Sequence, residues 1–173
     1  VLDASSSMGA DQRAALKRAT DAFIDALDLA GHPDAEVGVV QFSNAAKVLC
    51  QLTNRSSQAK SCVAHLGAIG NSCIACGITA GAGVLRRGRS QSTDLATLRE
   101  VLIVVADGEN ATGREPVLTA ATQAKADGIE VFTVCLGPAC DAAVLHAAAT
   151  SPRHALAARV DLAVTLPLAF DQI

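Results

Sequence analysis

The chain has 173 residues with 14 basic and 17 acidic side chains, so its formal net charge at neutral pH is −3. Half of the residues are hydrophobic and only 2% are aromatic, with no tryptophan and no tyrosine. This apolar content excludes a disordered chain. An acidic chain with only four aromatic side chains available for base stacking is also a poor candidate for a nucleic-acid-binding protein.

Strand-like and helix-like segments alternate along the chain. Val1 and Leu2 have the pattern of the end of a strand whose beginning is missing. The run Val101–Val105 consists of five aliphatic residues, which is typical of a central parallel strand covered on both faces. The further strands are expected at 37–42, 47–52, 130–136 and 154–158, and the helices at 11–29, 56–66, 75–85, 115–127, 141–149 and 161–170.

This alternation predicts a three-layer, Rossmann-like α/β sandwich with helices on both faces of a mostly parallel, six-stranded sheet. The hairpin near residues 37–52 is expected to add one antiparallel edge strand. No internal repeat or linker is visible, so residues 1–173 are expected to form a single domain. The longest uncharged run, Ser61–Leu85, contains five glycines, His65 and Asn71, and is too polar for a membrane span.

Side chains with oxygen ligands follow the predicted strands, at the edge where ligands bind in a parallel sheet. Asp3, Ser5 and Ser7 alternate in one loop after the first strand, so their side chains can point inward together. Ser72 lies in a glycine-flanked loop before a helix, and Asp107 ends the most apolar strand. Carboxylates with hydroxyls suit Mg²⁺ or Mn²⁺ better than Zn²⁺, which favours histidine and cysteine.

Each of these segments is ordinary by itself, because Asp-x-Ser is a common turn or helix N-cap and Asp-Gly is a frequent turn after a strand. Together they indicate a metal site. Two aspartates at one buried edge of a sheet repel each other unless a divalent cation lies between them.

The series Asp3-x-Ser5-x-Ser7, Ser72 and Asp107-Gly108 resembles the metal-ion-dependent adhesion site of the von Willebrand factor type A domain. The segments VGVVQFS, GNSCIACGI and GIEVFTVCLG resemble that family as well, and the likeness extends from Val1 to Ile173. The family usually has threonine where this chain has Ser72. The hydroxyl is therefore kept, and the methyl group that packs the loop is lost.

The resemblance implies a role for each of these residues. Ser5 and Ser7 would bind the ion directly, while Asp3 and Asp107 would bind it directly or through water. Ser72 would supply the hydroxyl of the second loop. A glutamate or aspartate of a protein partner would complete the coordination of the ion.

Six cysteines, an even number in a short chain, raise the question of disulfides and of export. Three disulfides are the favoured interpretation, with Cys50–Cys62 and Cys135–Cys140 as the best pairs. Cys73 and Cys76 form a CxxC motif at a helix start, which could be redox-active. This motif could instead form a four-thiolate zinc site with Cys135 and Cys140, or the cysteines could be free thiols. The expected location is extracellular or at the cell surface, with the periplasm as an option.

The basic cluster Arg86-Arg87-Gly88-Arg89 follows the predicted helix 75–85. It could contact an anionic partner. Basic side chains at a helix C-terminus are ordinarily solvated and interact with the helix dipole. We therefore expect a solvated helix end.

The leading functional hypothesis is a non-catalytic, divalent-metal-dependent module that binds a protein partner, as in adhesion. A second hypothesis is a structural part of a surface assembly whose metal stabilises the fold. A third is a metal-assisted hydrolase, for which Glu109 is the nearest candidate general base. The sequence has no phosphate-binding loop motif, dinucleotide-binding glycine motif or nucleophile-elbow motif. We therefore expect that this protein is not an enzyme.

Overall fold

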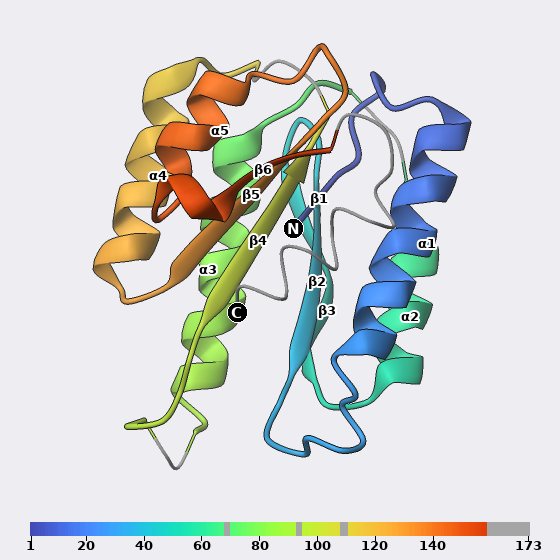
Figure 1. Cartoon of the computed structure of the whole chain (residues 1–173), viewed down its shortest axis with the longest axis vertical. Helices are drawn as coiled ribbons and strands as arrows, with labels where there is room; N and C mark the ends of the chain where they lie inside the picture. The colour runs from blue at the N-terminus through green and yellow to red at the C-terminus, as the bar shows by residue number, and fades with distance from the viewer. Residues whose placement is uncertain (68–69, 93–94, 108–110, 159–173) are drawn as a thin grey trace.

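The structure is a computed structural model that describes residues 1–67, 70–92, 95–107 and 111–158. Its centre is a six-stranded sheet with the strand order β3-β2-β1-β4-β5-β6 (Figure 1). Among the strands of the described residues, only β2 and β3 pair antiparallel, and the other neighbours pair in parallel, which confirms the predicted mixed sheet with one antiparallel edge strand. The strands are β1 Leu2–Asp3, β2 Val37–Phe42, β3 Ala46–Thr53, β4 Val101–Ala106, β5 Glu130–Leu136 and β6 Ala155–Ala158.

Helices cover both faces of the sheet, as the three-layer prediction requires. In Figure 1, α1 and α2 lie on one side of the sheet, and α3, α4 and α5 lie on the other. None of the helices that the structure describes has the length and hydropathy needed to cross a bilayer. The predicted helix 161–170 lies outside the described residues. The helices are α1 Ala10–Ala26, α2 Ser56–Ala64, α3 Ile74–Arg89, α4 Arg114–Ala126 and α5 Ala142–Ala148, followed by a 3₁₀ turn, Pro152–His154.

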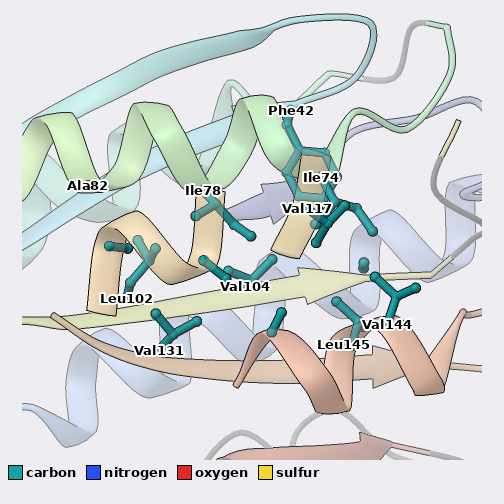
Figure 2. Close-up of a cluster of buried hydrophobic side chains, with 14 of the residues drawn as sticks. Phe42, Ile74, Ile78, Ala82, Leu102, Val104, Val117, Val131, Val144 and Leu145 are labelled. Carbon is teal, nitrogen blue, oxygen red and sulfur yellow. The ribbon is translucent and has the colours of Figure 1, made fainter. Parts of the chain in front are cut away.

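The hydrophobic core has one half on each face of the sheet. On the first face, Leu16 and Ile24 of α1 pack with Val105 of β4. On the second face, Ile78 of α3 packs with Val104 of the same strand, as Figure 2 shows. Because successive side chains of β4 enter opposite halves of the core, this strand needs apolar residues at every position. Burial on both faces therefore explains the uninterrupted aliphatic run of β4.

Small residues on α3 allow this helix to lie close to the sheet. A Cβ atom at Gly77 would be 2.7 Å from the ring Cδ1 of Phe42, which is less than real Cβ contacts allow. The Phe42 ring therefore lies against the backbone of the first turns of α3. This packing places the N-terminus of α3 at the edge where β1 and β4 end, which positions the site described below.

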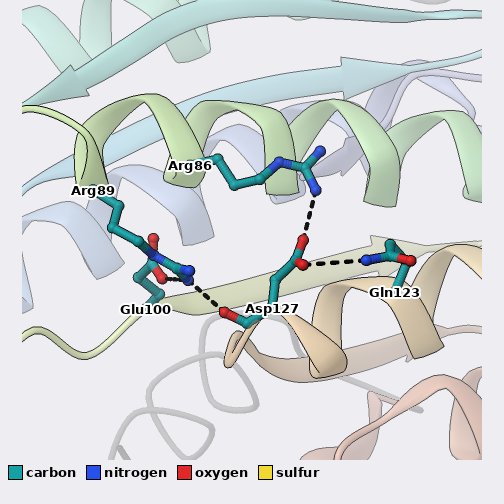
Figure 3. A network of polar contacts seen from close by, with 5 residues as sticks. All are labelled: Arg86, Arg89, Glu100, Gln123 and Asp127. Atoms are coloured by element: carbon teal, nitrogen blue, oxygen red, sulfur yellow. Dashed lines mark hydrogen bonds and ion pairs between the residues drawn. The ribbon is translucent and has the colours of Figure 1, made fainter.

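Two arginines of the basic cluster at the end of α3 are bound to other parts of the protein (Figure 3). The expected solvated helix end is wrong for the half-buried Arg89, whereas Arg86 is exposed, as expected, although it is paired. Arg86 Nη1 lies 2.6 Å from Asp127 Oδ2, and Arg89 Nη2 donates to the Asp127 carbonyl at 2.6 Å. Arg89 also forms an ion pair with Glu100, which is 8% exposed. The hydrogen bond from Arg86 is the main cause that lowers the pKa of Asp127. The end of α3 is thus tied to the end of α4 and to the segment before β4.

Candidate metal centre

The loop after β1 begins with a buried aspartate. Asp3 is fully buried and lies opposite Phe42 in the parallel ladder between β1 and β2. The Ala4 amide continues this ladder by donating to the Phe42 carbonyl at 2.8 Å. The Ser5 amide donates to Asp3 Oδ1 at 2.8 Å and closes a tight turn. This turn directs the side chains of Asp3 and Ser5 to the same side.

The second loop carries Ser72 and is held by hydrogen bonds on two sides. The Ser6 amide and hydroxyl both donate to the Gly70 carbonyl, at 2.8 and 2.7 Å. On the other side, the Asn71 amide donates to Asn44 Oδ1 at 2.8 Å, and the Cys73 amide donates to the Ser43 carbonyl at 2.8 Å. The loop after β1 and the β2–β3 turn therefore fix the loop in which Ser72 lies.

The five side chains that the sequence pattern selects lie together at the carboxyl ends of β1 and β4. Ser72 Oγ donates to Asp3 Oδ2 at 3.1 Å. Ser7 Oγ donates to Asp107 Oδ1 at 3.0 Å and lies 2.8 Å from Ser5 Oγ. Ser5 Oγ also lies 3.5 Å from Asp107 Oδ1. The side-chain oxygens of three separate loops thus form one connected group, which we call the oxygen cluster.

Negative charge is concentrated in the oxygen cluster. Asp3 and Asp107 are 0% and 5% exposed, and the Asp107 amide lies 3.5 Å from Asp3 Oδ2. Burial, and secondarily the charge of Asp3, raises the pKa of Asp107 above its usual range. None of the ion pairs in the described part of the chain includes either aspartate. The two carboxylates therefore share a buried site without an ion-paired cationic side chain from these residues.

The donor set fits a hard divalent cation. It consists of carboxylate and hydroxyl oxygens only, which Mg²⁺ and Mn²⁺ prefer. Within the described ranges, no three histidine, cysteine, aspartate or glutamate side chains come together, as a typical zinc site would require. Ser7 is exposed, whereas Asp3, Ser5, Ser72 and Asp107 are buried. The oxygen cluster is therefore open on the side of Ser7.

All six cysteines are paired in three disulfides, and no free cysteine remains. These include the two pairs that the sequence favours, Cys50–Cys62 and Cys135–Cys140, with Cα atoms 5.8 and 5.7 Å apart. The third pair is Cys73–Cys76, with a Cα separation of 5.3 Å. The hypotheses of free thiols and of a four-thiolate zinc site are wrong for this structure, because no thiol is left for either.

The residues that hold the Ser72 loop have no clear signal in the sequence. Ser43 and Asn44 have the pattern of a hairpin turn, and no local pattern connects Asn44 with Asn71, 27 residues away. A weak signal exists at Gly70. This glycine has a φ of +77°, and a Cβ atom there would lie 2.6 Å from Asn44 Cγ.

A family model for the von Willebrand factor type A domain matches residues 1–171. The chain belongs to this family. The match covers the oxygen cluster and every strand of the sheet. No curated protein matches the chain.

Solved structures support the fold of this von Willebrand factor type A domain. Proximal thread matrix protein 1 of the mussel byssus is 22% identical, with a TM-score of 0.82 over 98% of this chain and 45% of that one. In a second structure of that protein, with a TM-score of 0.86, zinc occupies its adhesion-site motif. The corresponding domain of the pilus tip protein Mfa5 of Porphyromonas gingivalis is 15% identical, with a TM-score of 0.70 over 99% of this chain and 90% of that one. Because the match covers 45% of the mussel protein's chain, this chain spans less than half of that protein.

Proposed function

We propose that the oxygen cluster binds Mg²⁺ or Mn²⁺ and that the bound ion captures an acidic side chain of a protein partner. The observation that carries this proposal is the burial of Asp3 and Asp107 together, with three hydroxyls and without an ion-paired cationic side chain in the described part of the chain. A divalent cation between the two carboxylates would offset their repulsion.

The proposed roles follow the chemistry of each group. Ser5, Ser7 and Ser72 would coordinate the ion through their hydroxyls, and Asp3 and Asp107 would do so directly or through water. Because most of these donors are uncharged, the ion would keep much of its positive charge and would attract a further carboxylate. The exposure of Ser7 supports approach of the partner from that side.

Family membership supports an interaction module, since von Willebrand factor type A domains are mostly non-catalytic protein-binding modules. Zinc in the adhesion-site motif of the mussel protein supports metal binding at the corresponding position of this chain. The hydroxyl-rich donor set favours Mg²⁺ or Mn²⁺ over zinc here. Glu109, the candidate general base of the hydrolase hypothesis, lies outside the described residues.

We also propose that the protein acts outside the cytoplasm, at a cell surface or in the extracellular space. Its three disulfides support this location, because such bonds persist in oxidising compartments. A module that captures acidic partners at a surface would act in adhesion or in the assembly of a surface structure.

Replacing Asp3 with alanine is expected to abolish the stabilisation that Mg²⁺ gives. In the unaltered protein, Mg²⁺ at 100 times its Kd should stabilise the fold by about 2.7 kcal/mol. In a domain of this size, this corresponds to a rise in Tm of about 5 to 10 °C. Thermal unfolding with Mg²⁺ and with EDTA measures the effect, and the Asp3→Ala protein should unfold at the same temperature in both.

Two serines of one loop provide a matched control. Ser7→Ala removes a hydroxyl of the oxygen cluster, while Ser6→Ala removes a hydroxyl that donates to the Gly70 carbonyl. Only Ser7→Ala should reduce the response to Mg²⁺, because the Ser6 amide still donates to the Gly70 carbonyl when the Ser6 hydroxyl is lost. An equal response of Asp3→Ala and the unaltered protein would show that the ion does not bind here. Retention of a partner from a surface extract in Mg²⁺, but neither in EDTA nor by Asp3→Ala, would support the adhesion role.

A further inference from the structure

The disulfide between Cys73 and Cys76 lies directly beside the candidate ligand Ser72. Cys73 is the N-cap of α3, with a non-helical φ of −99° and ψ of 81°, and Cys76 lies in the first turn of that helix. The bridge therefore connects the end of the Ser72 loop to the rigid start of α3. No role in the oxygen cluster itself uses either sulfur.

This bridge has a local effect on the structure. It encloses only Ile74 and Ala75, which α3 already holds in helical conformation. Closing so short a loop removes less entropy from the unfolded chain than closing a longer one. By contrast, Cys50–Cys62 joins β3 to α2 across a separation of 12 residues. The bridge in the CxxC motif therefore acts mainly on its neighbours, and the adjacent polar residue is Ser72.

Without the bridge, the start of α3 would have a weak cap. The Cys76 amide donates to Cys73 Sγ at 3.3 Å, where most helices use an oxygen of asparagine, aspartate, serine or threonine. Sulfur is a weak acceptor. The same residue holds the Ser72 loop to the β2–β3 turn, because the Cys73 amide donates to the Ser43 carbonyl at 2.8 Å. Any loosening at Cys73 would therefore reach the Ser72 hydroxyl and its contact with Asp3.

We infer that Cys73–Cys76 is an exchangeable disulfide whose oxidation state sets the affinity of the oxygen cluster for divalent cations. The inference rests on the proposed metal site. A small dithiol is the reductant. One of its thiolates attacks the sulfur of Cys76, which is half-buried, and the sulfur of Cys73, a residue only 5% exposed, leaves with the electron pair of the broken bond. The second thiolate then closes the reductant into a disulfide and releases Cys76, so two thiols form as one dithiol is oxidised.

Reduction is expected to weaken Mg²⁺ binding about ten-fold, which is the lower end of the effect of removing a group that orients a metal ligand. It should also speed amide hydrogen exchange at Cys73, since that amide is held to the Ser43 carbonyl only while the N-cap keeps its place. The exchange rate reports on the loop whether or not an ion binds.

Two variants separate the bridge from the cap. Cys73→Ala/Cys76→Ala removes both and should bind Mg²⁺ at least as weakly as the reduced protein, which keeps the weak sulfur cap. Cys73→Asn/Cys76→Ala replaces the bridge with a good oxygen cap, so it should bind as tightly as the oxidised protein and should not respond to dithiothreitol. Cys135→Ser/Cys140→Ser is the control for loss of a bridge elsewhere, and it should still lose Mg²⁺ affinity when dithiothreitol is added.

Isothermal titration with Mg²⁺, with and without dithiothreitol, gives the affinities. Differential alkylation and mass spectrometry identify the reduced bridge, and hydrogen exchange follows Cys73. Equal affinity and equal exchange in both oxidation states would overturn the inference, as would full retention of affinity in Cys73→Ala/Cys76→Ala. Failure of the oxidised protein to bind Mg²⁺ or Mn²⁺ would instead refute the proposed function, and with it the control of affinity.

Discussion

Replacing Arg89 with methionine is expected to lower the free energy of unfolding by about 3 kcal/mol, the usual lower limit for breaking a buried ion pair. Arg89 pairs with Oε2 of Glu100, a residue that is 8% exposed. The other carboxylate oxygen, Oε1, is buried without a hydrogen-bond partner among the described residues. The variant would therefore leave Glu100 buried without a cation. The Arg89 side chain is 34% exposed, which places the loss at the lower limit.

The neighbouring Arg87 provides a matched control. It contacts Gln51 at the surface at 3.4 Å, so Arg87→Met should change stability by less than about 0.5 kcal/mol. Urea unfolding measures both variants, with an unchanged slope as the condition for comparing midpoints. Adding Glu100→Met to Arg89→Met should recover most of the loss, since no charge is then left unpaired. Equal stabilities of the two arginine variants would show that the ion pair contributes nothing.

These contacts of the basic cluster could not be predicted from the sequence. The local pattern, three arginines at a helix end, is that of a solvated C-terminus. The partners of Arg89 lie 11 and 38 residues further along the chain, and only the packing of α3 beside β4 and α4 brings them near. The same contacts explain why α3 continues to Arg89, although its apolar pattern predicts an end at residue 85.

Most of the fold could be predicted because its elements have strong local signals. Strands β2 and β5 have the predicted bounds, since turn residues delimit both apolar runs. Helix α1 ends at Ala26, three residues before the predicted end. Asp28 adopts a positive φ of 43°, which a right-handed helix does not allow. A backbone reversal of this kind at a residue other than glycine leaves little trace in the sequence.

The sequence predicts which side chains lie in the candidate site, but it does not predict the contacts that hold the Ser72 loop in place. The alternation of Asp3, Ser5 and Ser7 after a strand, and Asp107 after another, places their side chains at one sheet edge by topology alone. The contact of Asn44 with the Ser72 loop depends on how the β2–β3 turn meets that loop, which no local pattern records. Binding of an ion by the five side chains stays a proposal.

Replacing Phe42 with alanine is expected to destabilise the protein by about 3 to 5 kcal/mol and to reduce the stabilisation by Mg²⁺ as well. The ring is fully buried against the backbone of α3 at Gly77, so its removal leaves a cavity under the start of that helix. The Phe42 backbone pairs with Asp3 and accepts the Ala4 amide at 2.8 Å. A collapse around the cavity would therefore displace both the loop after β1 and the helix that follows Ser72.

The second buried phenylalanine separates these two effects. Phe132 of β5 is also fully buried, and its ring contacts His154 at a centroid distance of 4.1 Å. In the sheet, β1 and β4 lie between β5 and the strand β2 that carries Phe42, so Phe132 is remote from the loop after β1. Phe132→Ala should cost a similar free energy of unfolding, because it removes the same side-chain volume. It should nevertheless keep the full stabilisation by Mg²⁺, measured by urea unfolding with Mg²⁺ and with EDTA. If Phe42→Ala also keeps that stabilisation, the packing under Asp3 supports the fold but does not position the oxygen cluster.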